Sequence, residues 1–333
     1  MSLRVFKMMG MALCLGIAGA AAGEASGAEA WREEAMETPS PQGPLRGTLL
    51  TPVGLISPTA TVLIIPGSGP TDRDGNGPLG LQAATYRLLA EGLAVRGIAT
   101  VRIDKRGMFG SASALRDAND VTLHDYAHDV TQWIRSIRQQ TKANCVWAMG
   151  HSEGGIVALM ADPDTTGMCG LILVAVPGRP LGALLREQLQ ANPANAPLLD
   201  QAFGAITSLE AGQRVEMATL HPALRPLFRP AVQGFLIDSL PIDPARLITT
   251  ARAPILILQG SRDLQVGVAD ARRLHAAAAR SKLVVLPDVN HVLKTVATED
   301  RATNLESYGR ADLAIAPAVV GAIADFIASL PPR

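Results

Sequence analysis

Charged residues and aromatic rings are scarce in this sequence. Of its 333 residues, 18% are charged and 4% are aromatic, and the 30 basic residues balance the 30 acidic ones. No run of basic residues occurs, so the chain lacks the clustered positive charge with which proteins neutralise nucleic-acid phosphates. We therefore expect no nucleic-acid partner. A small neutral or amphiphilic substrate fits this charge balance, and the shortage of rings argues against a pocket built mainly from aromatic side chains.

Cysteine is also scarce, and one of the three cysteines lies in a distinctive N-terminal segment. Arg4 and Lys7 precede an apolar stretch over residues 8–22, and small residues follow through Ala28. This order is typical of a secretory signal peptide. The alternative, a transmembrane anchor, needs about 20 apolar residues, and Glu24 interrupts the stretch before that length. We therefore expect residues 1–28 to be removed on export, which leaves a periplasmic or secreted protein without a stable membrane anchor.

The two remaining cysteines, Cys145 and Cys169, would then lie in a compartment where disulfides persist. Each stands near the start of a predicted strand, and the two strands are neighbours if the sheet is doubly wound. A disulfide requires Cα atoms within about 7 Å of each other. A bridge and two buried free thiols are both compatible with the sequence.

Short runs rich in valine, isoleucine and leucine alternate with amphipathic segments of helix length. This alternation predicts an α/β protein with a mostly parallel, doubly wound sheet covered by helices. The predicted strands cover residues 47–50, 61–65, 99–103, 145–149, 171–176, 255–258 and 282–286. The predicted helices cover residues 81–96, 121–140, 152–160, 266–279 and 316–330.

The alternation stops between residues 178 and about 250. Leucines recur there at helical spacing, and several prolines divide the remainder. This pattern predicts a helical lid inserted into one domain that spans residues 29–333. A packed helical excursion without any gating role remains an open alternative.

A serine stands between an apolar strand and a helix, in the sequence Gly150-His151-Ser152-Glu153-Gly154. This G-x-S-x-G pattern is typical of a nucleophile elbow, a sharp turn that presents a serine at the end of a parallel sheet. The two small residues, Gly150 and Gly154, allow the backbone to bend tightly. Ser152 is therefore the candidate nucleophile.

A serine hydroxyl is a weak nucleophile and needs a base that is itself oriented by an acid. His291 follows the last predicted strand, in the loop where a base would meet the serine at the carboxyl edge of the sheet. Asp263 follows the strand at 255–258, at the same edge, and is the candidate acid. Asp288, three residues before His291, is the alternative acid. We expect a structural role for His151, because its side chain should leave the turn in a different direction from that of Ser152.

A tetrahedral intermediate also needs N–H donors aimed at its oxyanion. The backbone N–H of Glu153 is one candidate. The second is the N–H of Ser68, in the glycine-rich loop that follows the strand at 61–65. These two residues are the predicted oxyanion hole.

Two sequence patterns match known metal-binding motifs incompletely. The segment from Asp72 to Gly77 matches the first half of a calcium-binding EF-hand loop, but its twelfth position is Ala83 instead of glutamate. His124 and His128 have helical spacing, but no third ligand accompanies them. We therefore expect no metal and no cofactor.

Five motifs together resemble the α/β-hydrolase superfamily, and within it the bacterial carboxylesterases related to the serine aminopeptidase-like group. The motifs are Gly67-Ser68-Gly69-Pro70-Thr71-Asp72-Arg73-Asp74-Gly75-Asn76, Asp104-Lys105-Arg106-Gly107, the elbow, Gln259-Gly260 with Asp263, and Asn290-His291. The resemblance covers roughly residues 43–330 in motif order. It implies the α/β-hydrolase fold and a triad in the chain order Ser152, Asp263, His291.

The sequence therefore predicts a serine hydrolase that cleaves short- to medium-chain carboxylic esters through an acyl-enzyme intermediate. An alternative is an exopeptidase or amidase acting on small peptides, which would need an anionic anchor for the substrate amine, such as Asp72, Asp74 or Glu153. An alternative of another class is a non-catalytic binding protein that has kept the fold.

Overall fold

The computed structural model describes residues 30–55, 57–78, 80–117, 120–161 and 167–331. The predicted signal peptide, residues 1–28, lies outside the described residues. The described chain is built around an eight-stranded sheet with the strand order β1-β2-β4-β3-β5-β6-β7-β8. The strands are β1 (Trp31–Thr38), β2 (Leu45–Pro52), β3 (Ala60–Ile65), β4 (Ile98–Ile103), β5 (Val146–His151), β6 (Met168–Val174), β7 (Ile255–Gly260) and β8 (Lys282–Leu286).

Most of this sheet is parallel. β2 pairs antiparallel with both β1 and β4, and every pairing from β4 through β8 is parallel. The central strands β3, β4, β5, β6 and β7 are buried almost along their whole length. Burial on both faces explains why these strands are continuous apolar runs in the sequence. The prediction of a mostly parallel, doubly wound α/β sheet is confirmed.

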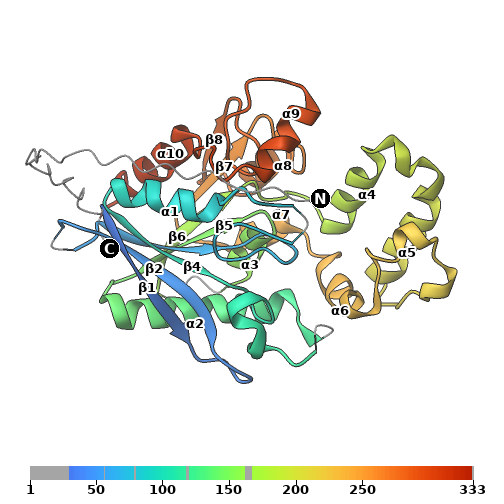
Figure 1. The fold of residues 1–333 in the computed structure, drawn as a ribbon, viewed down its shortest axis with the longest axis horizontal. Helices are drawn as coiled ribbons and strands as arrows, with labels where there is room; N and C mark the ends of the chain where they lie inside the picture. The colour runs from blue at the N-terminus through green and yellow to red at the C-terminus, as the bar shows by residue number, and fades with distance from the viewer. Residues whose placement is uncertain (1–29, 56, 79, 118–119, 162–166, 332–333) are drawn as a thin grey trace, which may run out of the picture.

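Helices cover both faces of the sheet (Figure 1). One hydrophobic core lies under α1 and α10, and the other lies under α2, α3 and α8. The α-helices are α1 (Thr85–Val95), α2 (Leu123–Thr141), α3 (Glu153–Met160), α4 (Leu181–Gln190), α5 (Leu199–Glu210), α6 (Pro230–Ser239), α7 (Pro244–Leu247), α8 (Val268–Ala277), α9 (Arg301–Glu306) and α10 (Pro317–Ala328). Short 3₁₀ helices are η1 (Phe109–Ala114), η3 (Pro193–Leu198), η4 (Met217–Thr219), η5 (Pro222–Leu224), η6 (Ile248–Thr250) and η7 (Ser307–Gly309).

Strand β1 has no counterpart among the predicted strands. It lies at the edge of the sheet, where only β2 pairs with it, and most of its side chains are exposed. Its sequence WREEAMET therefore carries charges where a central strand would carry valine or isoleucine. An edge strand that is partly solvated lacks the apolar run that marks the central strands.

The segment between β6 and β7 is helical and contains α4, α5, α6 and α7. Figure 1 shows α4, α5 and α6 grouped beside the sheet layers. This group has its own hydrophobic cluster, which includes Ile206, Leu209 and Phe228. Two of the leucines at helical spacing, Leu185 and Leu189, pack against that cluster, so they stabilise the insert itself.

A disulfide joins Cys145 to Cys169, with Cα atoms 5.1 Å apart. The two residues lie at the amino ends of the neighbouring strands β5 and β6. Among the described residues, no helix has the length and apolar character needed to cross a membrane.

Candidate active site

Ser152 lies at the junction of β5 and α3, in an unusual backbone conformation. Its φ is 54° and its ψ is −125°, a region that side-chain-bearing residues rarely occupy and that costs roughly 1–3 kcal/mol. The Ser152 N–H donates to the carbonyl of Val174, which extends the ladder between β5 and β6 by one bond. The chain then turns at once into α3. A strained serine between a strand and a helix is the geometry of a nucleophile elbow.

The two elbow glycines are required by close backbone contacts. A Cβ on Gly150 would lie 2.2 Å from the carbonyl oxygen of Gly154, and a Cβ on Gly154 would lie 2.3 Å from the carbonyl oxygen of Ile65. Both distances are far shorter than any van der Waals contact. A side chain at position 150 would push α3 away from β5, and a side chain at position 154 would push α3 away from the end of β3.

The structure brings His291 and Asp263 into contact. The Nδ1 of His291 lies 2.8 Å from Oδ2 of Asp263, and both side chains are almost completely buried. Burial alone would raise the pKa of Asp263, but His291 and the backbone N–H groups of Gln265 and Val266 hold it below its usual value. The carboxylate is therefore ionised at neutral pH. An Nδ1–H of the imidazole can donate to this carboxylate, and in that tautomer Nε2 carries the lone pair.

Asp263 itself is held by four hydrogen bonds. Its Oδ1 accepts from the N–H groups of Gln265 and Val266, at 2.7 and 2.9 Å. Its Oδ2 accepts from Gln259 Nε2 at 3.1 Å, in addition to the bond with His291. Gln259 belongs to the predicted motif Gln259-Gly260, but the sequence did not indicate that its side chain donates a hydrogen bond to Asp263.

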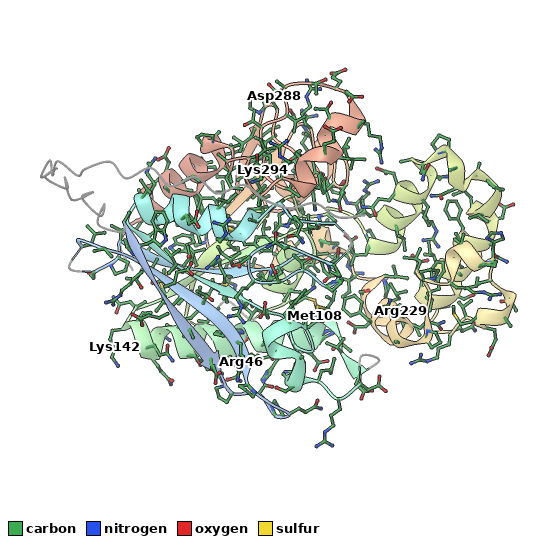
Figure 2. The ribbon with its side chains drawn as sticks, in the orientation of Figure 1. Arg46, Met108, Lys142, Arg229, Asp288 and Lys294 are labelled. Carbon is green, nitrogen blue, oxygen red and sulfur yellow. A yellow bond between two sulfur atoms is a disulfide. The ribbon has the colours of Figure 1, made fainter. Side chains whose placement is uncertain are left out.

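The alternative acid, Asp288, has a different partner. It lies on the outer loop after β8 (Figure 2) and accepts a hydrogen bond from Arg262 Nε at 3.2 Å. Its backbone φ is 55°, a turn conformation that aspartate tolerates better than most residues. Asp288 is therefore a turn residue paired with arginine, whereas the contact with His291 belongs to Asp263.

His151 links the elbow to the His291 loop. Its Nδ1 accepts from the hydroxyl of Tyr86 at 3.0 Å, and its Nε2 donates to the carbonyl of His291 at 2.9 Å. The rings of His151 and His291 have centroids 4.7 Å apart. Burial and the neighbouring His291 lower the pKa of His151 to about 3. A neutral imidazole with one donor and one acceptor suits these two bonds.

Tyr86 extends the same chain of hydrogen bonds to the loop after β3. Its hydroxyl oxygen accepts from the N–H of Gly67 at 2.9 Å while the O–H donates to His151. Burial raises the pKa of Tyr86 well above its ordinary value, so the phenol stays protonated. Sequence analysis did not identify Tyr86, because a tyrosine on an amphipathic helix gives no signal of this contact.

The loop after β3 lies directly against the elbow. A Cβ on Gly67 would lie 3.3 Å from the Cβ of Ser152. The N–H of Gly67 donates to Tyr86, whereas the next residue, Ser68, is exposed. The other candidate donor, Glu153, is the first residue of α3, and an N–H at that position has no acceptor within its own helix.

The residues with partial metal patterns make other contacts. Asp72 Oδ1 accepts from the N–H groups of Asp74 and Asn76, and Asp74 pairs with Arg102 at 2.6 Å. Within the part of the chain that the structure describes, no group of three or more histidine, cysteine, aspartate or glutamate residues could hold a metal ion.

Comparison with known proteins agrees with this fold. A family model described as "Alpha/beta hydrolase family" matches residues 62–303, which is more than half of the chain. The chain therefore belongs to the α/β hydrolase family, and we class the protein as a hydrolase. Comparison with the curated proteins gives no match.

Several solved structures have a similar architecture. The Pyrococcus furiosus esterase Pf2001 has a TM-score of 0.57 at 15% identity, over 90% of this chain and 91% of its own. Est1E from Butyrivibrio proteoclasticus has a TM-score of 0.54 at 16% identity, over 88% of this chain and 99% of its own. The esterase domain of a Rhodothermus marinus protein has a TM-score of 0.51 at 18% identity, over 88% and 98%. At such low identities these likenesses show the fold alone.

Proposed function

We propose that the protein is a serine hydrolase that cleaves small carboxylic esters through an acyl-enzyme intermediate. The observation that carries this proposal is the buried pair of Asp263 and His291, at the same edge of the sheet as a serine in a strained elbow. β5, β7 and β8 are parallel members of one sheet, so the loops that follow them meet at its carboxyl edge.

The proposed reaction begins with proton transfer from Ser152 Oγ to the Nε2 of His291. The serine oxygen attacks the ester carbonyl, and Asp263 stabilises the imidazolium that results. His291 then returns the proton to the leaving alcohol. Water, deprotonated by the same imidazole, attacks the acyl-serine and releases the carboxylic acid. No cofactor enters this sequence of steps.

The developing oxyanion is assigned to the N–H groups of Ser68 and Glu153. The close approach of Gly67 to Ser152, where a Cβ on Gly67 would lie 3.3 Å from the Cβ of Ser152, supports this assignment, because Ser68 is the next residue of that loop. The start of α3 adds the positive end of a helix dipole. A donor of this kind contributes about 3 kcal/mol to transition-state stabilisation.

Ester substrates are favoured over peptides by the contacts of the acidic residues. A peptide's free amine would need an uncommitted carboxylate near the serine. Asp72 accepts bonds from its own turn, Asp74 pairs with Arg102, and Glu153 is buried against Lys105. Esterases also occur among the similar solved structures, including one of Est1E with ferulic acid bound. We also propose that the substrate carries a short- to medium-chain acyl group and that the helical insert α4–α6 gates access to the site.

We also propose that the protein is exported. The N-terminal sequence supports this, and so does the disulfide between Cys145 and Cys169, since such bonds persist in oxidising compartments.

Hydrolysis of a chain-length series of nitrophenyl esters tests the proposal, with aminoacyl anilides measured alongside. We expect ester turnover to exceed anilide turnover and to be lost in Ser152→Ala. Anilide turnover far above ester turnover would instead establish a peptidase. A protein inactive on both, with Ser152→Ala identical to wild type, would be the non-catalytic binding protein.

A further inference from the structure

The turn after β4 carries three consecutive charged residues, and each is buried. Asp104, Lys105 and Arg106 are 2%, 4% and 8% exposed. Asp104 accepts from Arg73, and Arg106 pairs with Asp129 on α2 at 2.5 Å. These two pairs fasten the turn to its surroundings, but neither of them touches the elbow.

Lys105 has a different set of partners. Its ammonium group donates to the carbonyl oxygen of Gly67 at 2.6 Å and to Glu153 Oε1 at 3.3 Å. The same nitrogen lies 5.3 Å from the centroid of the Tyr126 ring. A buried charge is costly unless it is paired and hydrogen-bonded, and these contacts supply both.

The contact with Gly67 has a consequence for Ser68. The carbonyl of Gly67 and the N–H of Ser68 belong to one planar trans peptide, so they point to opposite sides of it. A donor that fixes the carbonyl oxygen on one side therefore fixes the direction of the N–H on the other. The opposite side of Gly67 is also held, because its own N–H donates to Tyr86.

The hydrogen bond from Lys105 to Glu153 involves the residue that carries the second proposed oxyanion donor. Glu153 supplies the other proposed oxyanion N–H from its backbone, and its side chain accepts from Lys105. One ammonium group thus connects the two segments whose N–H groups must converge on a single oxygen. Its positive charge also polarises the Gly67–Ser68 peptide in the sense that strengthens the Ser68 N–H as a donor.

We propose that Lys105 is a positioning residue that holds the N–H groups of Ser68 and Glu153 in register to form the oxyanion hole. This inference rests on the proposed function. It assigns Lys105 no contact with the substrate. Its effect should appear where negative charge develops on the oxygen, and only weakly in the binding of the planar ester.

The test compares Lys105→Met with Arg106→Met. The control also loses a buried ion pair, but it touches neither Gly67 nor Glu153. For nitrophenyl butyrate we expect Lys105→Met to lower kcat by about 10- to 100-fold with KM changed less than about threefold, as expected for a misaligned oxyanion donor. The Ki of an alkyl trifluoromethyl ketone, which forms a tetrahedral adduct with the serine, should rise by a similar factor. Lys105→Arg keeps a cationic donor and should recover most of the loss.

The control separates positioning from stability. Arg106→Met should lower the melting temperature but leave kcat and the ketone Ki within about threefold of wild type. If Lys105→Met does not fold, Lys105→Gln is compared with Arg106→Met in its place. An active wild type whose Lys105 variant keeps kcat and Ki within threefold overturns this inference alone. A wild type that neither hydrolyses esters nor reacts with a fluorophosphonate overturns the proposed function and this inference with it.

Discussion

Replacing Asp263 with asparagine tests the role of the acid through the tautomer of His291. The backbone N–H groups of Gln265 and Val266 both donate to Oδ1 of Asp263, so an asparagine there must direct its carbonyl oxygen toward them. Its NH₂ group then occupies the place of Oδ2, 2.8 Å from His291 Nδ1. Because the NH₂ group is a donor, the proton of the imidazole has to move from Nδ1 to Nε2. The base would then present an N–H to Ser152 where it needs a lone pair.

The expected loss is large. Amidation of a triad acid that leaves the geometry intact lowers kcat by about 10⁴-fold, which corresponds to roughly 5 kcal/mol of transition-state stabilisation. The variant should still fold, because asparagine has the same shape and keeps the two backbone bonds, and it loses only the bonds that Oδ2 accepts from His291 and Gln259. The assay is kcat for nitrophenyl butyrate at neutral pH, with the melting temperature measured in parallel.

The matched control is Asp288→Asn. Asp288 pairs with Arg262 on the outer loop, so its amidation should change kcat less than about threefold, as for an ordinary surface ion pair. A folded Asp263→Asn variant that keeps more than a tenth of the wild-type kcat would refute the tautomer argument. So would an Asp288→Asn variant with the larger loss, because the acid would then have been assigned to the wrong residue.

Three further predictions concern stability. The His151 imidazole titrates near 6.5 when unfolded but near 3 when folded, so between these values the unfolded chain binds more protons, and the free energy of unfolding should fall by roughly 1 kcal/mol per pH unit on acidification. Denaturant titrations from pH 6.5 to 4.5 measure this slope, and an imidazole that protonates near pH 6 in the folded protein by NMR would contradict it. Tyr86→Phe leaves the N–H of Gly67 and the Nδ1 of His151 without a partner, and it should lower the free energy of unfolding by about 2–4 kcal/mol. The control is Tyr126→Phe, at a buried tyrosine outside this chain of bonds, which should cost less than about 1 kcal/mol. Equal losses in the two variants would contradict the role given to Tyr86. Cys145 and Cys169 are 24 residues apart, and reducing their disulfide should lower the free energy of unfolding by about 3 kcal/mol with little change in kcat. Unchanged stability on reduction would show that the disulfide does not constrain the unfolded chain.

The sequence was sufficient to predict the parallel core of the sheet. Strands such as β3 and β5 are buried on both faces, and their apolar runs are long enough to be recognised without tertiary information. β1 was missed because its position at the sheet edge leaves it polar. Its pairing depends on β2, a partner that local pattern cannot reveal.

Some residues of the candidate site could likewise be predicted from the sequence, and others could not. Ser152 could be identified because the bend of the elbow is local and demands glycines at fixed positions. His291 and Asp263 follow strands of one parallel sheet, so topology alone predicts that they approach each other. Tyr86 and Lys105 could not be assigned their contacts, because each reaches Gly67 from an element distant in the chain. Side-chain contacts of this kind depend on the packed structure and leave no periodic trace in the sequence.

The most direct measurement of the central claim is mass spectrometry of the purified protein after reaction with a fluorophosphonate. The account predicts a single covalent phosphonyl adduct on Ser152, complete loss of ester hydrolysis, and neither adduct nor hydrolysis in Ser152→Ala. Labelling at a different residue, or ester turnover that survives in Ser152→Ala, would contradict it.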